Sequence, residues 1–251
     1  MKTELSFSLV GYRKLIQLIF ELGWEFVEYP DLEFPLNTKH SLLLRHDIDA
    51  ELCVLEPFLE IERLAGVTAT YFVMLESPLY NVYSPEGRKA IEKITEAGQS
   101  VGLHFFAEIH REQTASELIS LIEEQCHSLA TLVGKEIKTF SFHQPTPSML
   151  QMNISPPGMI NTYHPKVMNT FKYLSDTNMN WRSNDPLEVL SRQDAGVQML
   201  VHPIWWMVDG DTPVDRWRNL LKLLNRINAN HLLERERTLA DVPLASLISD
   251  I

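Results

Sequence analysis

SLLLRHDIDA, residues 41–50, joins an apolar run to a cluster of charged and imidazole groups. The apolar run is typical of a strand buried on both faces, as the strands of a parallel sheet are. Alternate side chains of an extended segment point to the same side, so Asp47 and Asp49 should face one pocket, with His46 and Ile48 facing away. Two carboxylates this close raise each other's proton affinity unless a cation neutralises them. The stretch predicts a divalent metal on one aspartate and a free base on the other.

A structural role is the alternative interpretation for Asp49. Ala50 and Glu51 begin a helical stretch, and an aspartate directly before a helix commonly caps it.

Strand-like and helix-like segments alternate outward from this stretch. Apolar residues at helical spacing predict helices over 12–22, 51–64, 85–97, 114–133 and about 213–235. β-Branched and aromatic content predicts further strands at 68–75, 100–106, 137–144, 159–163, 171–176 and 197–203. The repeated order predicts a parallel sheet, and about seven strands without a linker favour a single-domain, distorted (β/α) barrel spanning residues 1–251. An open, doubly wound sheet is the alternative.

Composition narrows the class of protein. The chain has 251 residues, with 22 Lys and Arg against 33 Asp and Glu, so its formal net charge is −11. This excludes a general nucleic-acid binder, because clustered basic residues supply phosphate affinity. The sequence shows neither a signal peptide nor a membrane span, so we expect a cytoplasmic protein. Its two cysteines, Cys53 and Cys126, argue against a disulfide framework.

Histidines follow several of the predicted strands at the point where each strand ends. His104 follows SVGL, His143 follows FSF and His202 follows QMLV. Because the carboxyl ends of parallel barrel strands share one face, these imidazoles should converge with the aspartates of HDID on one pocket. Such a group is typical of a metal or acid/base site. The other histidines are expected at the surface: His40, His127, His164 and His231.

Several motifs from Leu42 to Trp206 together resemble a known family. They are RHDID, TATYFVMLESPLYNVYSPEGR, GQSVGLHF, SFHQP, INTY, YLSDTNMNWRSNDP and LVHPIWW. In this order and spacing, the chain resembles the polysaccharide deacetylase family of NodB-like, metal-dependent carbohydrate esterases, in a branch found with O-antigen and capsule biosynthesis. The resemblance implies a distorted (β/α) barrel and one divalent metal, usually zinc, with cobalt or nickel as alternatives. It also implies hydrolysis of an N-acetyl group on a sugar.

The resemblance implies a role for each matching residue. Asp47 matches the catalytic base of the family, and Asp49 matches its metal-binding aspartate. His104 matches the first metal-binding histidine. His202, in LVHP, matches the histidine that protonates the leaving amine.

The chain departs from the family pattern at the remaining metal ligand. The family has a second histidine four residues after the first, and here that position is Glu108, with His110 two residues too far along. His143 stands in SFHQP, where the better-known esterases have an arginine-containing motif that orients the base. We expect His143 to be the third ligand. Glu108 and a site without tightly bound metal are the alternatives.

The remaining site predictions concern the substrate. Asp176 and Trp181 are the nearest matches to the aspartate–tryptophan pair that lines the sugar site in the family, and Asn180 stands where a second acid is expected. Asp176 is then left as the partner of His202. Arg182 and the Trp205/Trp206 pair offer a guanidinium and aromatic faces to a carboxylate-bearing or pyranose substrate. The other expected substrate-binding residues are Tyr80 and Asn81, followed by Asn161 and Tyr163.

The sequence therefore favours a metal-dependent hydrolase that removes an N-acetyl group from an amino sugar in O-antigen or capsule biosynthesis. One alternative is a cytoplasmic amidase acting on a sugar-nucleotide or another small amide. The other is a carbohydrate-binding protein that keeps the barrel without the chemistry. The simultaneous presence of a base, an acid and metal ligands argues against the binding protein, which needs no such set.

Overall fold

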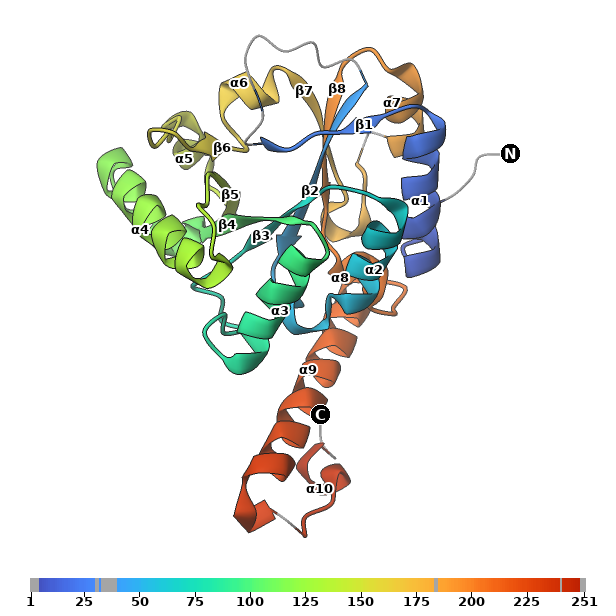
Figure 1. The fold of residues 1–251 in the computed structure, drawn as a ribbon, viewed down its shortest axis with the longest axis vertical. Helices are drawn as coiled ribbons and strands as arrows, with labels where there is room; N and C mark the ends of the chain where they lie inside the picture. The colour runs from blue at the N-terminus through green and yellow to red at the C-terminus, as the bar shows by residue number, and fades with distance from the viewer. Residues whose placement is uncertain (1–4, 30–31, 33–39, 183–184, 240, 249–251) are drawn as a thin grey trace.

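The strands of the computed structural model alternate with helices along most of the chain (Figure 1). The structure describes residues 5–29, 32, 40–182, 185–239 and 241–248. The strands are β1 (Glu25–Phe26), β2 (Ser41–Ile48), β3 (Thr70–Val73), β4 (Ser100–Phe106), β5 (Thr139–His143), β6 (Ile160–Asn161), β7 (Phe171–Ser175) and β8 (Gly196–Val201).

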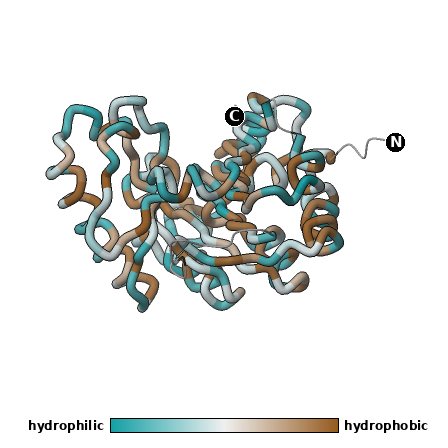
Figure 2. Tube along the Cα trace, turned by 90° about the horizontal axis from the view of Figure 1, so that it is seen from above, coloured by the Kyte–Doolittle hydropathy of each residue, from teal (hydrophilic) through white to brown (hydrophobic). Residues whose placement is uncertain are grey.

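The helices surround these strands. The α-helices are α1 (Leu9–Glu21), α2 (Glu56–Ala65), α3 (Pro85–Glu96), α4 (Ala115–Val133), α5 (Pro147–Gln151), α6 (Pro165–Met168), α7 (Pro186–Arg192), α8 (Ile204–Met207), α9 (Pro213–Arg235) and α10 (Leu244–Ile248). Short 3₁₀ turns are η2 (Leu52–Val54), η3 (Ala107–His110), η4 (Thr177–Met179) and η5 (Arg237–Leu239). Hydrophobic and hydrophilic residues alternate along the outer helices (Figure 2).

The strands form one parallel sheet in the order β6-β5-β4-β3-β2-β8-β7, and β1 pairs with β2 beside this path. The predicted distorted (β/α) barrel of about seven parallel strands is confirmed. Among the described residues, β6 and β7 are the two ends of the path, so the barrel is curled but open along one seam. The side chains of Tyr163 and Tyr173 meet across that seam, with ring centroids 6.3 Å apart.

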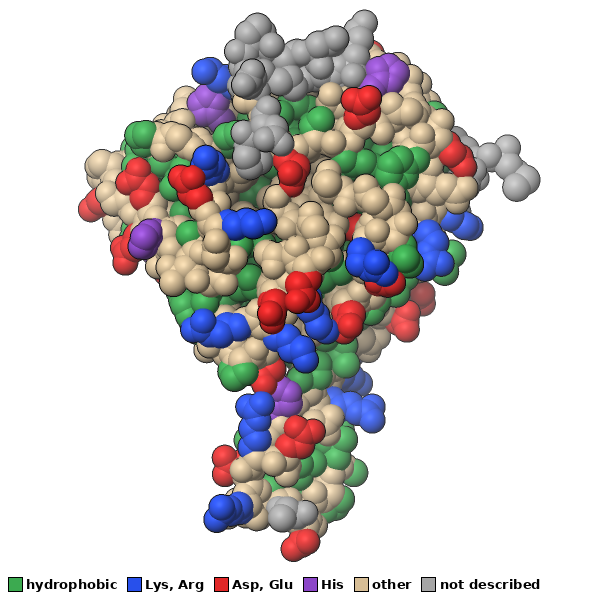
Figure 3. All heavy atoms as spheres, in the orientation of Figure 1, with side chains coloured by type: hydrophobic (Ala, Val, Ile, Leu, Met, Phe, Trp, Pro, Cys, Tyr) green, Lys and Arg blue, Asp and Glu red, His purple; other side chains and the backbone are tan. Residues whose placement is uncertain are grey.

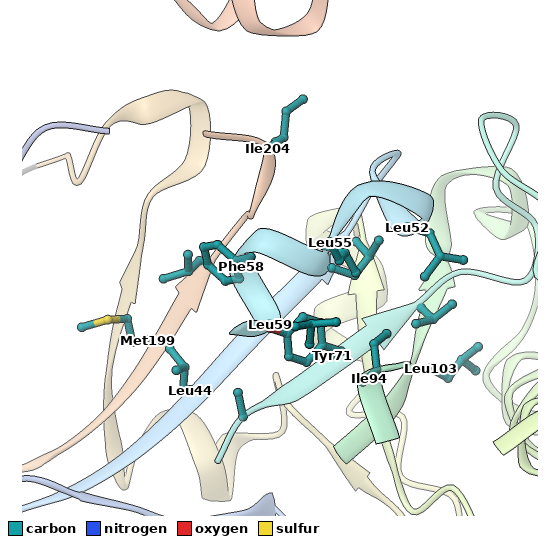
Figure 4. Close-up of a cluster of buried hydrophobic side chains, with 14 of the residues drawn as sticks. Leu44, Leu52, Leu55, Phe58, Leu59, Tyr71, Ile94, Leu103, Met199 and Ile204 are labelled. Carbon is teal, nitrogen blue, oxygen red and sulfur yellow. The ribbon is translucent and has the colours of Figure 1, made fainter. Parts of the chain in front are cut away.

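The core has two layers, because side chains of each strand alternate between the barrel interior and the helices. Outside the sheet, α2 and α3 pack on the strands through residues such as Phe58, Ile94 and Leu103 (Figure 4). Inside, a smaller cluster closes the barrel and comprises Tyr29, Leu43, Phe72, Val167 and Phe171. All residues of β2 are buried, which explains why its first half is the continuous apolar run Leu42–Leu44 rather than an alternating pattern.

The predicted helix over 51–64 is divided in the structure. Residues 52–54 form the 3₁₀ turn η2, and α2 begins only at Glu56. Pro57 explains the boundary, because proline lacks an N–H and is tolerated only in the first turn of a helix. Cys53 and Cys126 are both free.

The end of the chain projects from the barrel (Figure 1). The first turns of α9 lie beside α8, and its second half extends away from the sheet with α10 alongside. The face in Figure 3 shows acidic and basic side chains interspersed over the barrel and along this projection. Among the described helices, none combines the length and apolar character needed to cross a membrane.

Candidate metal centre and active site

A cavity of about 410 Å³ opens where the parallel strands end. Side chains from the ends of β2, β4, β5, β7 and β8 line it, so segments distant in sequence meet there, as the barrel topology predicts. Its lining includes Asp47, Asp49, His104, His143 and His202. The side chains along β2 alternate as predicted. Asp47 faces the cavity, whereas His46 points to the opposite side and contacts Glu62.

Asp49, His104 and His143 form a compact cluster that suits a metal ion. Asp49 Oδ1 lies 3.3 Å from His104 Nε2 and 3.0 Å from His143 Nδ1, and the two nitrogens are 3.2 Å apart. Tetrahedral zinc ligands at bond lengths of 2.0–2.1 Å lie about 3.4 Å from one another. The three donor atoms are therefore spaced like three corners of such a site.

The chemistry of the donor set also fits a metal. Asp49 Oδ1 is buried and, within the described part of the chain, accepts no well-aligned hydrogen bond, although both imidazoles are close. Burial would raise the pKa of Asp49, but His104 and His143 outweigh burial and lower that pKa below its ordinary value. Two nitrogens and one carboxylate oxygen that line an open cavity would suit a catalytic rather than a structural zinc ion.

Ser141 connects the cluster to the predicted base. His104 Nδ1 lies 2.7 Å from Ser141 Oγ, which leaves His104 Nε2 facing the cluster. The Ser141 hydroxyl also lies 3.5 Å from Asp47 Oδ1. A partner of this kind fixes the ring orientation of a ligating histidine.

A buried arginine holds Asp47 in place. Arg45 Nε and Nη2 donate to the two oxygens of Asp47, each at 2.7 Å. The same guanidinium donates to Thr162 Oγ1 at 2.9 Å and to the Tyr163 hydroxyl at 3.1 Å. Burial would raise the pKa of Asp47, but the charge of Arg45 outweighs burial and, with His104, lowers that pKa. Asp47 is thus ionised and fixed in orientation.

His202 is supported by Asp176. Asp176 Oδ1 lies 2.6 Å from His202 Nδ1, both carboxylate oxygens accept from the His202 backbone N–H at 3.1 Å, and Trp206 Nε1 donates to Oδ2 at 2.8 Å. Burial would lower the pKa of His202, but the charge and hydrogen bond of Asp176 outweigh burial and raise it to about 9. Among the described residues His202 Nε2 has no partner, so it can face a substrate. Asp176 is fully buried and cannot itself touch one.

Glu51, beside the cluster, is an acid that the sequence did not single out. It is buried, accepts from Ala50 N at 3.0 Å and from Ile204 N at 3.3 Å, and so joins the end of β2 to the turn after His202. Burial, with the charge of Asp49, raises the pKa of Glu51 to about 7.

The structure does not place Glu108 in the metal cluster. Glu108 is exposed on η3, which turns away from the cavity after β4. His110 contacts Glu76 at 2.8 Å instead. Asp49 does not cap the following turn either, since η2 has Glu51 at its start and no side-chain cap.

The predicted substrate-binding residues divide into two groups. Arg182, Trp205 and Tyr163 line the cavity, whereas Tyr80, Asn81 and Trp181 do not. The Tyr80 hydroxyl donates to Ile48 O at 2.8 Å and accepts from Met74 N, so it fixes the end of β2.

The residues outside the cavity stabilise neighbouring segments. Asn81 Oδ1 accepts from Tyr83 N, and Asn161 joins Ile154 O to Tyr163 N. Trp181 stacks on Phe7.

Sequence reasoning missed several residues that line the cavity. They are Gln144, Tyr173, Asn178 and Trp217. Gln144 and Asn178 lie in or beside loops without periodic pattern, and Tyr173 lies within β7, where it read as an ordinary strand residue. Trp217 belongs to the apolar stripe of a long helix, which favoured a core position. Arg45 could have been predicted as a partner of Asp47, because residues two apart on a strand have side chains on the same side.

These features define an α/β protein with a distorted parallel barrel and an Asp-His-His cluster beside a buried aspartate, Asp47, and a histidine, His202. No family model and no curated protein matches the sequence. Solved structures do match. The chitin deacetylase of the fungus Colletotrichum lindemuthianum is 16% identical over 73% of this chain and 80% of that one, with a TM-score of 0.46. The peptidoglycan deacetylase of Bacillus subtilis is 14% identical over 82% and 96%, with a TM-score of 0.40.

A pseudoenzyme of carbohydrate esterase family 4 from Bacillus anthracis also matches, at 16% identity and a TM-score of 0.40, over 75% of this chain and 61% of that one. A mutant of that protein with restored activity matches over 64% of its length. The chain thus spans less than two thirds of the Bacillus anthracis protein. The identities of 14–16% and TM-scores of 0.40–0.46 make these likenesses distant, so the chemistry has to be read from the side chains of this chain.

Proposed function

We propose that this protein is a metal-dependent hydrolase that removes an N-acetyl group from an amino sugar. One observation carries the proposal. Asp49, His104 and His143 present three ligand atoms within 3.3 Å of one another, directly beside an ionised aspartate and a protonated histidine. This is the combination that amide hydrolysis needs: a site for a Lewis acid, a base and an acid.

The cluster would hold one divalent ion, which polarises an acyl carbonyl and lowers the pKa of water when bound. Its two imidazole nitrogens and one carboxylate oxygen suit zinc, with cobalt and nickel as alternatives. The metal dependence of the reaction is part of the proposal.

Asp47 acts as the general base. It is ionised, and Arg45 fixes both of its oxygens, which leaves lone pairs that can accept a proton from water on the cavity side. As water attacks the acyl carbon, its proton passes to Asp47.

His202 acts as the general acid. Asp176 keeps the imidazole protonated and holds its Nδ1, so Nε2 is the atom that donates a proton to the departing amine nitrogen. The C–N bond breaks as that N–H bond forms. The products are acetate and a free amino sugar.

The biological setting is also a proposal. The sequence motifs RHDID and LVHP, in their order along the chain, resemble a branch associated with O-antigen and capsule biosynthesis. We propose a cytoplasmic reaction in that process, on a surface polysaccharide unit or on its sugar-nucleotide precursor.

The test is acetate release from N-acetylglucosamine oligosaccharides and from UDP-N-acetylglucosamine, using protein purified without chelator and then stripped and reloaded with zinc, cobalt or nickel. We expect activity in the loaded protein, its loss on stripping and its loss in Asp47→Asn with metal content retained. Glu108→Gln is the matched control, since this exposed acid lies outside the cluster. Full activity in Asp47→Asn, or sugar binding without any hydrolysis, would contradict the proposal, and the latter would favour a binding protein.

A further inference from the structure

The acidic groups of the site already have positive partners. Asp47 is paired with Arg45 and Asp176 with His202, each at hydrogen-bond distance. Asp49 belongs to the cluster that suits a cation. Among the described residues that line the cavity, no carboxylate is therefore left over for a further basic group.

Arg182 is a further basic group in the same cavity. It lines the cavity, is exposed, and among the described residues its guanidinium makes neither an ion pair nor a hydrogen bond. Several other exposed arginines of this acidic protein pair with acids: Arg63 with Glu60, Arg192 with Glu188, Arg218 with Asp215 and Arg235 with Glu86. Among the described residues, Arg13, Arg88 and Arg237 are exposed without an acidic partner, but unlike Arg182 they do not line this cavity. The position of Arg182 in the cavity is therefore what makes its unpaired charge available to a ligand of the site.

The backbone at the cavity rim adopts an uncommon conformation that holds polar side chains there. Gln144, Asn178 and Arg182 all line the cavity and have positive φ angles of 48°, 56° and 56°. The Arg182 backbone N–H donates to Asn180 Oδ1 at 2.7 Å, which fixes that turn. Non-glycine residues in this region are uncommon and concentrate at ligand-binding sites.

A buried donor on the cavity wall also lacks an acceptor. Trp205 is 3% exposed and lines the cavity, yet its Nε1–H has no hydrogen-bond partner among the residues that the structure describes. Its ring meets Trp217 edge-on, with centroids 6.2 Å apart, so the indole is held in place. A buried unpaired N–H is costly, and a substrate oxygen would satisfy it.

We infer that Arg182 binds an anionic group of the substrate, a carboxylate or a phosphate, while the Trp205 N–H donates to another oxygen of the same molecule. The amino sugar that this site hydrolyses is then an acidic one. This inference rests on the proposed function and specifies its substrate class. A guanidinium is well suited to either anion, because its N–H groups match the two oxygens.

The test compares kcat/KM for three N-acetylated substrates with metal-loaded protein. They are methyl N-acetylglucosaminide, which is neutral, its uronic acid, which carries a carboxylate, and UDP-N-acetylglucosamine, which carries phosphates. We expect an acidic substrate to be preferred, and Arg182→Gln to reduce the acidic-to-neutral ratio by roughly tenfold or more, as loss of a charged hydrogen bond does. Whichever acidic substrate is preferred identifies the anion.

Two further variants distinguish a specific loss of anion binding from a general loss of folding or activity. Arg63→Gln removes the same charge from an exposed helix position, and we expect it to keep the ratio. Trp205→Phe keeps an aromatic ring but loses the N–H, and we expect a raised KM. A ratio near one in the unmodified protein, or a ratio unaffected by Arg182→Gln, would overturn the inference while acetate release still supported the proposed function.

Absence of hydrolysis for all three substrates would instead contradict the proposed function. The inference then remains testable by tryptophan fluorescence, because Trp205 and Trp217 line the cavity. We expect an acidic ligand to bind more tightly than the neutral one and to lose that advantage in Arg182→Gln. Equal binding of neutral and acidic ligands would overturn it.

Discussion

At the scale of single residues, the base and the acid of the site owe their protonation states to different neighbours. Arg45 lowers the pKa of Asp47, and Asp176 raises the pKa of His202 to about 9. At neutral pH the first group is therefore ready to accept a proton and the second to donate one. Acid/base catalysis requires environments that lower the pKa of one group and raise the pKa of the other in this way.

The raised pKa of His202 predicts the alkaline limit of activity. Only protonated His202 can donate, so kcat should fall as pH rises through about 9. Asp176→Asn removes the charge that raises this pKa, and the alkaline limb should then move down toward the ordinary histidine value of 6.5. The measurement is kcat against pH for both proteins with saturating metal. An alkaline limb that stays in place in Asp176→Asn would contradict this role.

Arg45 is a positioning residue for Asp47. Arg45→Lys keeps a positive charge but loses the two parallel hydrogen bonds, so Asp47 should lose its fixed orientation. We expect kcat to fall by roughly 10- to 100-fold with KM little changed. Arg63→Lys is the control, because Arg63 makes the same paired contact with Glu60 on the surface. Equal kcat in the two variants would show that the orientation is unimportant.

Much of the metal cluster could be predicted, because ligands that follow parallel strands are recognisable from sequence. Asp49 follows the last residue of β2, His143 is the last residue of β5 and His104 lies in the second half of β4, and the structure brings their side chains together. The substrate side of the cavity was less predictable. Its residues lie on turns whose course depends on tertiary packing, so Tyr80 resembled a rim residue but fixes the β2 end, whereas Asn178 showed no signal.

At the scale of elements, β2 carries residues of the candidate site on one face and a residue of the buried core on the other. Its inner face carries Arg45 and Asp47, while its outer face carries His46, which is fully buried. His46 lies 2.7 Å from Glu62 of α2 and 3.1 Å from Val201 O, directly before His202. The end of β2 is therefore held by groups on neighbouring elements.

Glu62 is the acceptor at the centre of that outer network. Besides contacting His46, it accepts hydrogen bonds from the hydroxyls of Tyr12 and Tyr71, and all four side chains are buried. Glu62→Gln leaves one of these partners without an acceptor and should destabilise the fold by about 3 kcal/mol. Urea unfolding measures the change. Glu60→Gln, exposed on the same helix, should leave the unfolding midpoint in place, and similar midpoints for both variants would contradict the account.

Elements with strong local signals were well predicted. The helix over 114–133 matches α4 to within one residue, because Thr114 and Glu117 form a capping box and Gly134 ends the helix in the left-handed conformation. The extent of barrel closure could not be read from sequence. Strand β6 pairs with β5 at only two positions, which depends on how the loop before it packs.

At the scale of the whole molecule, the metal cluster joins three strands. Asp49 follows β2, while His104 and His143 lie on β4 and β5, so a bound ion would cross-link segments that are far apart in sequence. An unfolded chain does not present these ligands together. Metal binding should therefore be coupled to the stability of the entire barrel.

This coupling predicts a metal-dependent unfolding temperature. Free metal at 100 times its dissociation constant stabilises a folded protein by about 2.7 kcal/mol. Thermal unfolding of stripped protein, followed with and without added zinc, should show a clear rise that His143→Ala abolishes. An equal rise in that variant would indicate that the ion binds elsewhere.

The most direct test of the account is elemental analysis of protein purified without chelator. We predict about one divalent ion per chain in the unmodified protein and its loss in both His104→Ala and His143→Ala, because each removes one ligand of three. His110→Ala is the matched control, since His110 contacts Glu76 outside the cluster and its loss should leave the ion bound. Retention of the ion in His143→Ala, or no bound ion in the unmodified protein even after incubation with zinc, cobalt or nickel, would contradict the central claim.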